Sequence, residues 1–282
     1  MNKLTKTTIS AADMVDLHRY PIADLEGRES REFALQCRQQ YQDTGLCMLP
    51  DFITSAAHEI LTAEANAITS QAYFCKSTHN AYLTENDPNV AAEDVSQRQE
   101  KTFVGSVPYD QIAGDTHLRQ LYLWDPLMEF IGFVLGKNEF YRFADPLGAC
   151  SINVFVEGGE HGWHFDESEF TVTLMLQAPE SGGAFEYVPK IRGVANERDI
   201  VSAVLDGDRS QVIELPFSAR TLLIFGGQAT IHRVTRVDGK RPRLVPILCY
   251  SEQKDLKNSE AVRKLFLGRS GDETAADTVS VQ

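Results

Sequence analysis

Residues 161–176 read HGWHFDESEFTVTLML, and the second half of this stretch indicates how the chain folds. From 170 to 177, apolar residues at the even positions alternate with other residues at the odd positions, the period of two that a β-strand gives its side chains. The even positions are again apolar over 150–156. Glycines and prolines separate further segments that fit short strands, at 184–188, 212–215, 221–225 and 244–250.

The first half of the chain has helical periodicity instead. We expect a helix over 30–43 that ends at Gly45, a short strand over 46–52, and a helix that Thr54 or Ser55 can cap. Apolar residues at helical spacing over 127–135, followed by Gly136, predict another helix with a glycine cap. The polar segment 76–100 is predicted to be a long loop, and loops of this length inside a domain are often functional.

Helices followed by many short strands predict a mainly β protein with N-terminal helices (α+β), whose core is a double-stranded β-helix, that is, a jelly roll or cupin-like barrel. We expect one domain over 1–282: a helical part at about 1–139, the jelly-roll core at about 140–252, and a C-terminal helix and tail at 253–282. The segment 190–211, with a helix from Asn196 to Leu205, is a candidate lid, and 268–282 is expected to be disordered.

Composition limits the classes of function. The chain is 43% hydrophobic and 24% charged, which is typical of a globular protein, and its formal net charge of −13 argues against a nucleic-acid partner. Five scattered cysteines without a CxxC pair indicate reduced thiols rather than a disulfide framework. No apolar run approaches the ~18 residues of a membrane span, so a cytoplasmic protein without a membrane partner is expected.

His164 and Asp166 are two residues apart after a predicted strand, so their side chains point the same way. His232 follows the turn Phe225-Gly226-Gly227 after another strand. Two imidazoles and one carboxylate form a facial set of ligands that leaves one side of an octahedral metal open, which suits non-haem Fe(II). These three residues are therefore predicted as the metal ligands and the catalytic centre.

Two arginines open the last predicted strand. A guanidinium matches a carboxylate in two contacts, so either Arg241 or Arg243 is a candidate to bind a co-substrate carboxylate. Arg243 shares a strand face with Val245, Ile247 and Cys249, and we expect it to lie deeper and to be the ligand, with Arg241 as the alternative.

The arrangement His164-x-Asp166, His232 and Arg243 resembles the core signature of Fe(II)/2-oxoglutarate-dependent oxygenases over roughly residues 140–252. Two longer runs, HGWHFDESEFTVTLMLQAPESGGAFEYVP and ATIHRVTRVDGKRPRLVPILCY, resemble the group of free-amino-acid hydroxylases and their halogenase relatives. The stretches LWDPLMEFIGFVLG and YRFADPLG extend this likeness back to about Asn80.

The resemblance implies a dioxygenase that uses Fe(II), 2-oxoglutarate and O2 and releases succinate and CO2. Halogenases of the group carry glycine or alanine where this chain has Asp166, which opens a coordination site for chloride. Because the carboxylate fills that site here, we expect hydroxylation of an unactivated C–H bond.

The substrate implied by the resemblance is a small molecule, a free L-amino acid with a basic one favoured, and no nucleic acid. Arg98 in the long loop is a candidate for the α-carboxylate, and Glu167 for the ammonium group. His161, Trp163 and Asn153 are further candidates to line the pocket, although His161, three residues before His164, is expected to face the opposite way on a strand.

Several alternatives remain open from the sequence. The enzyme could act on a carrier-bound or peptidyl amino acid, could desaturate rather than hydroxylate, or could be a non-catalytic jelly-roll sensor of metal and ligand. A homodimer is also left open.

Overall fold

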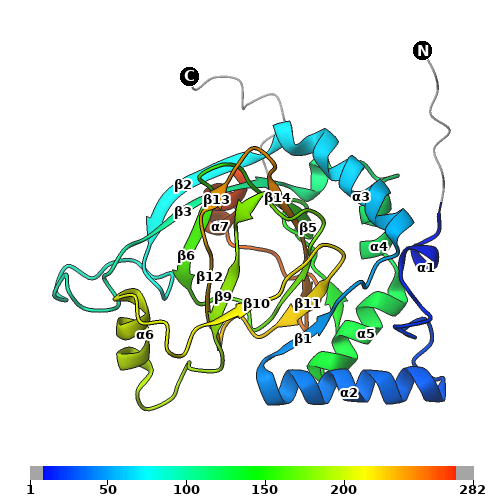
Figure 1. Ribbon diagram of the computed structural model, residues 1–282, viewed down its shortest axis with the longest axis horizontal. Helices are drawn as coiled ribbons and strands as arrows, with labels where there is room; N and C mark the ends of the chain where they lie inside the picture. Colours follow the sequence, from blue (N-terminus) through cyan, green and yellow to red (C-terminus); the bar gives the residue numbers. More distant parts are fainter. Residues whose placement is uncertain (1–8, 271–282) are drawn as a thin grey trace.

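The alternating segments form a curled antiparallel sheet in the computed structural model, which describes residues 9–270 (Figure 1). Its strands are β1 (Leu46–Leu49), β2 (Tyr73–His79), β3 (Glu100–Val107), β5 (Cys150–Phe155), β6 (Glu160–His164), β7 (Thr171–Leu174), β9 (Phe185–Val188), β10 (Ile213–Leu215), β11 (Leu222–Phe225), β12 (Ile231–Val234) and β14 (Arg243–Leu248). Two short pairs flank it: β4 (Tyr141–Arg142) with β15 (Tyr250–Ser251), and β8 (Ser181–Gly182) with β13 (Val237–Asp238).

The strand order is β1-β11-β7-β14-β5-β3-β6-β12-β9-β10, with β2 paired to the outside of β3. Strands β5 and β6 both pair antiparallel with β3, so they follow each other along it as one long bent strand. Strands β12 and β14 oppose β6 and β5 in the same manner. This curled arrangement is the predicted double-stranded β-helix, and its helices and strands together confirm the α+β class.

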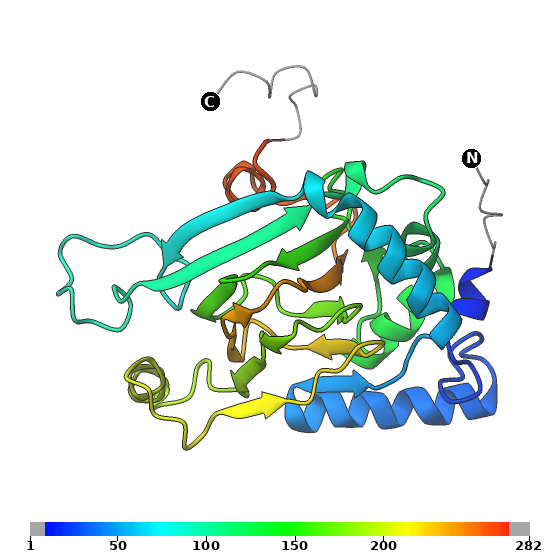
Figure 2. The ribbon, with the colours of Figure 1, turned by 45° about the horizontal axis from the view of Figure 1, so that its top comes forward.

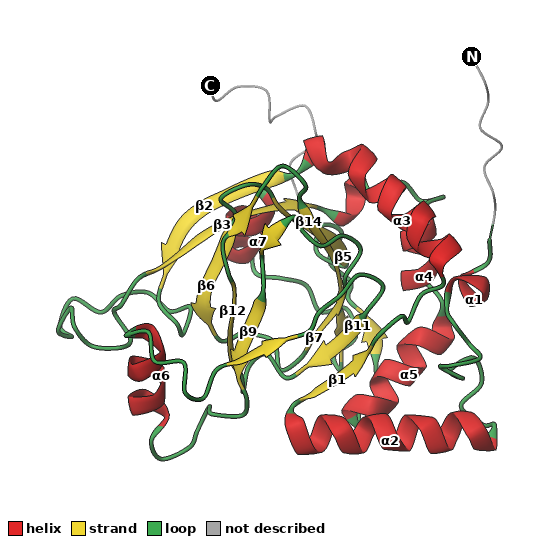
Figure 3. Ribbon diagram, viewed as in Figure 1, coloured by secondary structure: helices red, strands yellow, loops and turns green. Residues whose placement is uncertain are grey.

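Most helices lie on one side of the barrel, and α6 lies alone at the opposite end (Figure 3). The helices are α1 (Ala11–Met14), α2 (Arg28–Thr44), α3 (Ser55–Ile68), α4 (His117–Tyr122), α5 (Asp125–Leu135), α6 (Glu197–Leu205) and α7 (Glu260–Leu267), with short 3-10 turns at Thr69–Gln71 and Tyr109–Gln111. Their caps agree with the sequence: the Thr54 hydroxyl accepts from the Ala57 N–H, and Gly45 and Gly136 have φ values of 82° and 75°. Asn196 precedes α6 but makes no side-chain cap bond.

The alternation of the strands separates two environments. On β7, Val172 and Leu174 pack in the main core between the sheet and helices α1–α5, whereas Thr171 and Thr173 line a cavity inside the barrel. The same division holds on β14, where Leu244 belongs to that core. A smaller cluster of buried residues, including Trp163, Phe165 and Ile200, lies under the 190–211 insertion.

The N-terminal part supplies β1 to the sheet where the short strand over 46–52 was predicted, but it also supplies β2 and β3, which were not predicted. The loop predicted over 76–100 covers only 80–99, between β2 and β3, which form the long ribbon of Figure 2. Strand β2 pairs with β3 alone and is largely exposed, so its sequence lacks the apolar alternation of a half-buried strand.

The C-terminal segment is also better ordered than predicted at its start. Gly268 ends α7 with φ 76°, and Arg269 forms an ion pair with Asp110, at 2.6 Å and 2.7 Å to its two oxygens. Residues 271–282 of the predicted tail lie outside the described part of the chain. Over residues 9–270, no helix combines the length and apolar character that crossing a bilayer requires.

Helix α5 provides a test of this core. Phe130 is fully buried and stacks on Phe33 with 5.8 Å between ring centroids. We expect Phe130→Ala to lower the free energy of unfolding by about 3–5 kcal/mol in urea titrations, because it leaves a cavity. Leu123→Ala, at a side chain that is 49% exposed, should change it by about 0.5 kcal/mol or less, and equal effects of the two would contradict this packing.

Candidate metal centre

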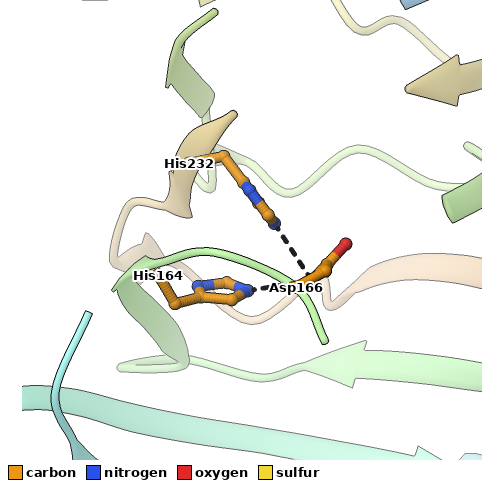
Figure 4. Close-up of side chains that lie close together, drawn as sticks. All are labelled: His164, Asp166 and His232. Atoms are coloured by element: carbon orange, nitrogen blue, oxygen red, sulfur yellow. Dashed lines mark ion pairs between the residues drawn. The ribbon is translucent and has the colours of Figure 1, made fainter. Parts of the chain in front are cut away.

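Two paired strands bring the predicted ligands together. His164 ends β6, His232 lies on β12, and the two residues are directly opposite each other in the ladder. Asp166 lies two residues beyond β6, in a loop that carries its side chain back to both imidazoles (Figure 4). The three side chains therefore converge from segments that are far apart in the sequence.

The distances fit a single metal ion. Oδ1 of Asp166 lies 3.4 Å from Nε2 of His164 and 3.4 Å from Nε2 of His232. The three possible ligand atoms all lie within 4.8 Å of one another. Two imidazole nitrogens and one carboxylate oxygen are the ligands of a non-haem Fe(II) facial site.

Backbone carbonyls fix the tautomers of both histidines. Nδ1 of His164 lies 2.8 Å from the Gly162 carbonyl, and Nδ1 of His232 lies 2.9 Å from the Thr230 carbonyl. Because a carbonyl only accepts, each Nδ1 carries the proton and each Nε2 keeps its lone pair for a metal. Burial, together with the neighbouring His232, lowers the pKa of His164, which keeps that ring neutral.

Asp166 is held as a carboxylate. Burial by itself would raise the pKa of this residue, but the charge that His232 carries when it is protonated in the metal-free protein lowers it well below its usual range. The Thr171 hydroxyl donates to Oδ2 at 2.6 Å, and the Asp166 N–H donates to the Gly227 carbonyl at 3.1 Å. The side chain is therefore ionised and oriented before any metal binds.

The expectation that His161 faces away from His164 is wrong. Their rings stack with centroids 3.9 Å apart, and the Nε2 of His161 is buried without a hydrogen-bond partner among residues 9–270. The reason is a bulge: His161 and His164 are three positions apart in the sequence, but their partners Val234 and His232 are only two positions apart. The extra residue turns His161 to the same face.

Arg243 lies deep in the barrel, 3% exposed, and lines the same cavity as the metal cluster. Its guanidinium lies over the rings of Phe155 and Phe217, 5.2 Å and 5.8 Å from their centroids. Its Nε is buried with no hydrogen-bond partner in the described chain, and burial lowers its pKa to about 9. A desolvated cation in an apolar wall is a strong site for an anion.

Solved structures of several 2-oxoglutarate enzymes share this fold. The epimerase SnoN and the carbocyclase SnoK, both non-heme α-ketoglutarate-dependent proteins from nogalamycin biosynthesis, match with TM-scores of 0.55 and 0.54 at 12% identity. The aligned parts cover 78% of this chain and 83% of SnoN, and 76% and 82% for SnoK. HygX from Streptomyces hygroscopicus, solved with nickel, 2-oxoglutarate and hygromycin B, matches at 0.50 and 15% identity over 77% of this chain and 86% of HygX.

The sequence pattern of the family described as Halogenase D matches residues 29–265. This chain belongs to the Halogenase D family. With its His–Asp–His cluster it is an Fe(II)/2-oxoglutarate oxygenase, and its cofactors are iron and 2-oxoglutarate. No curated protein sequence matches the chain significantly.

Two predicted site residues of this Halogenase D family member lie away from the cavity. Arg241 is exposed, and its guanidinium donates to the Ala178 and Pro179 carbonyls, each at 3.0 Å. Arg98 forms an ion pair with Asp206 at 2.8 Å, which joins the 80–99 loop to the end of α6. Neither arginine lines the cavity.

The other predicted residues divide between the cavity and the core. Glu167 and Asn153 line the cavity, and Asn153 accepts a hydrogen bond from the Ser106 hydroxyl at 3.2 Å. Trp163 is 2% exposed and packs behind the site, where Arg233 lies 4.8 Å from its ring centroid. It is not among the residues that line the cavity.

The structure adds residues that the sequence did not single out. The cavity, of about 750 Å³, is also lined by His79, by Glu85 and Asn86 of the 80–99 loop, and by Phe266 of α7. The polar character of the loop was a signal for function, but no periodicity identifies which loop side chains face inward. Phe266 reaches the site only because α7 packs across β2 and β3, a tertiary contact.

Buried histidines make the metal-free protein sensitive to acid. Burial and the neighbouring His164 lower the pKa of His79 to about 4, from an ordinary value of 6.5. Between these two pH values the unfolded chain binds a proton that the folded chain does not, so the free energy of unfolding falls as pH drops from 6.5 towards 4. The slope of the free energy of unfolding against pH gives the number of protons that the chain takes up on unfolding. With a chelator present, we expect His79→Gln to lower that number by about one between pH 4 and 6.5.

Exposed Leu123 supplies the control for this measurement. Leu123→Ala removes no titratable group and should leave the pH dependence of stability unchanged. An unaltered slope in His79→Gln would mean that His79 titrates alike in the folded and unfolded chains.

Proposed function

We propose that this protein hydroxylates an unactivated C–H bond of a free L-amino acid, with a basic amino acid favoured, and releases succinate and CO2. The observation that carries the proposal is Asp166, whose Oδ1 lies 3.4 Å from the Nε2 atoms of both histidines. A carboxylate in this place fills the coordination position that a halide would need. The family membership supports the class of chemistry.

In this proposal the chain's own residues hold the reactants. Nε2 of His164, Nε2 of His232 and Oδ1 of Asp166 are the ligands of the iron, and the carbonyls of Gly162 and Thr230 keep the two rings in the ligating tautomer. When bound, iron and 2-oxoglutarate supply the oxidising chemistry that no side chain can provide.

Arg243 is proposed to bind the distal carboxylate of 2-oxoglutarate. It shares the cavity with the metal ligands, and its charge is not neutralised by an ion pair with any residue from 9 to 270. The rings of Phe155 and Phe217 fix the plane of the guanidinium and leave its outer donors for a ligand.

The charges of the other residues that line the cavity support a cationic substrate. Glu85 and Glu167 both line it, and His161 is held neutral because burial, with His164 nearby, keeps its pKa well below 6.5. These groups suit an ammonium side chain or α-ammonium group. Arg98, proposed for the α-carboxylate, would have to leave Asp206 to reach the cavity.

Halogenation is the second candidate, because the matching family is described as Halogenase D. A mass-spectrometric screen of free amino acids with Fe(II), 2-oxoglutarate, O2 and chloride distinguishes the two. We expect a product that has gained one oxygen atom with at least one basic amino acid, and succinate formed alongside it. A chlorinated product would reverse the assignment, and the absence of amino-acid-stimulated turnover would point to another substrate class or to a non-catalytic sensor.

Alanine variants of His164, Asp166 and His232 are the controls for the site itself. Each removes one of three ligands, so we expect loss of Fe(II) binding in titrations and a fall in succinate formation of at least about a hundredfold. Full activity in all three would show that the metal binds elsewhere.

Arg243→Ala tests the 2-oxoglutarate site, and exposed Arg241→Ala is its matched control. Losing a buried charge-assisted contact should raise the KM for 2-oxoglutarate by about tenfold to a hundredfold, whereas Arg241→Ala should change it by about twofold or less. If only Arg241→Ala raises the KM, the co-substrate carboxylate binds one strand step away from Arg243.

A further inference from the structure

We propose that Thr171 and Gly227 together hold Asp166 so that only one of its oxygens is available to the metal. Thr171 is then a positioning residue for the oxygenase reaction, because it acts through Asp166. The inference rests on the proposed function, because it assigns a role to the second oxygen of a proposed iron ligand.

Thr171 holds the second oxygen from a fixed strand. It is the first residue of β7, pairs with Phe225 of β11, and its Oγ1 lies 2.6 Å from Oδ2 of Asp166. That is the length of a charge-assisted O–H to carboxylate hydrogen bond. A β-branched side chain in a strand has few accessible rotamers, so the hydroxyl is directed at Asp166 before a ligand arrives.

Gly227 supplies the space for the same oxygen. A Cβ at this position would lie 2.0 Å from Oδ2 and 2.6 Å from Cγ of Asp166, so the carboxylate occupies the volume that a side chain would take. The φ of Gly227 is not among the positive values of the chain, so the backbone there would accept alanine. The three atoms nearest to such a Cβ all belong to Asp166, which explains the need for glycine.

The consequence concerns how many positions the carboxylate takes. With Oδ2 held between Thr171 and Gly227, Oδ1 alone faces His164 and His232. One-oxygen binding leaves three positions of an octahedral metal for 2-oxoglutarate and O2. A carboxylate that rotated freely could bind through both oxygens and occupy one of them.

Thr173 provides a matched comparison on the same strand. It lies two residues after Thr171, lines the same cavity and is 7% exposed, but its hydroxyl has no hydrogen-bond partner within residues 9–270. Replacing either threonine with valine removes one hydroxyl group at nearly constant volume. Only the Thr171 variant should disturb Asp166.

The test is an anaerobic titration of the full-length, metal-free protein with Fe(II) alone. In Thr171→Val the ligating carboxylate loses a hydrogen bond, so we expect the dissociation constant for Fe(II) to rise by about tenfold. Thr171→Ser retains the hydroxyl and should stay within about twofold of the original protein, as should Thr173→Val. Urea unfolding of each variant checks that the chain is folded.

Gly227→Ala tests the second half of the proposal independently. It should weaken Fe(II) binding at least as much as Thr171→Val, because its methyl group displaces Oδ2. Gly114→Ala is the control, since the nearest atom to a Cβ there is 3.7 Å away.

Unchanged metal affinity in both Thr171→Val and Gly227→Ala would overturn the proposal, as would equal weakening in Thr171→Val and Thr173→Val. Failure of the proposed function has a different signature. In that case Asp166→Ala would bind Fe(II) as tightly as the original protein, or no amino acid would be oxidised while the Thr171 variants still lose metal affinity.

Discussion

The pairing of β6 with β12 is the constraint on which the site depends. It sets His164 opposite His232 and leaves Asp166 just beyond the strand end, where its carboxylate reaches both rings. A slip of one residue in this ladder would turn one histidine to the other face and separate the ligands. The carbonyls that hold both imidazoles come from the same two chain segments, so register fixes ligand position and tautomer together.

Side chains of the barrel strands face either the hydrophobic core or the cavity. A polar site inside the barrel is therefore compatible with a stable core outside it. Alternate residues of β7 and β14 pack against the helices, while the others line the cavity. Burying Arg243 in that interior is costly, because a buried cation without a counter-charge is destabilising until an anion binds. A co-substrate carboxylate would provide the missing negative charge, so binding of the co-substrate would also stabilise the buried guanidinium.

Local sequence signals predicted much of this fold. The glycines that end α2 and α5, the Thr54 cap and the alternation of β5, β7 and β14 act within a few residues, and the structure confirms them. Strand β2 was not found, since an exposed edge strand needs no apolar alternation. The facing of His161 was predicted wrongly because a bulge depends on the partner strand, which periodicity cannot detect.

The sequence by itself determined the ligand types and their order, the strand that carries Arg243, and the jelly-roll class, because each follows from residue chemistry or short-range periodicity. Only the tertiary structure decided which arginine enters the cavity, that Arg98 pairs with Asp206, and that Thr171 and Gly227 enclose one oxygen of Asp166. These are contacts between segments brought together by sheet curvature and strand register. Such contacts are absent from any single stretch of the chain.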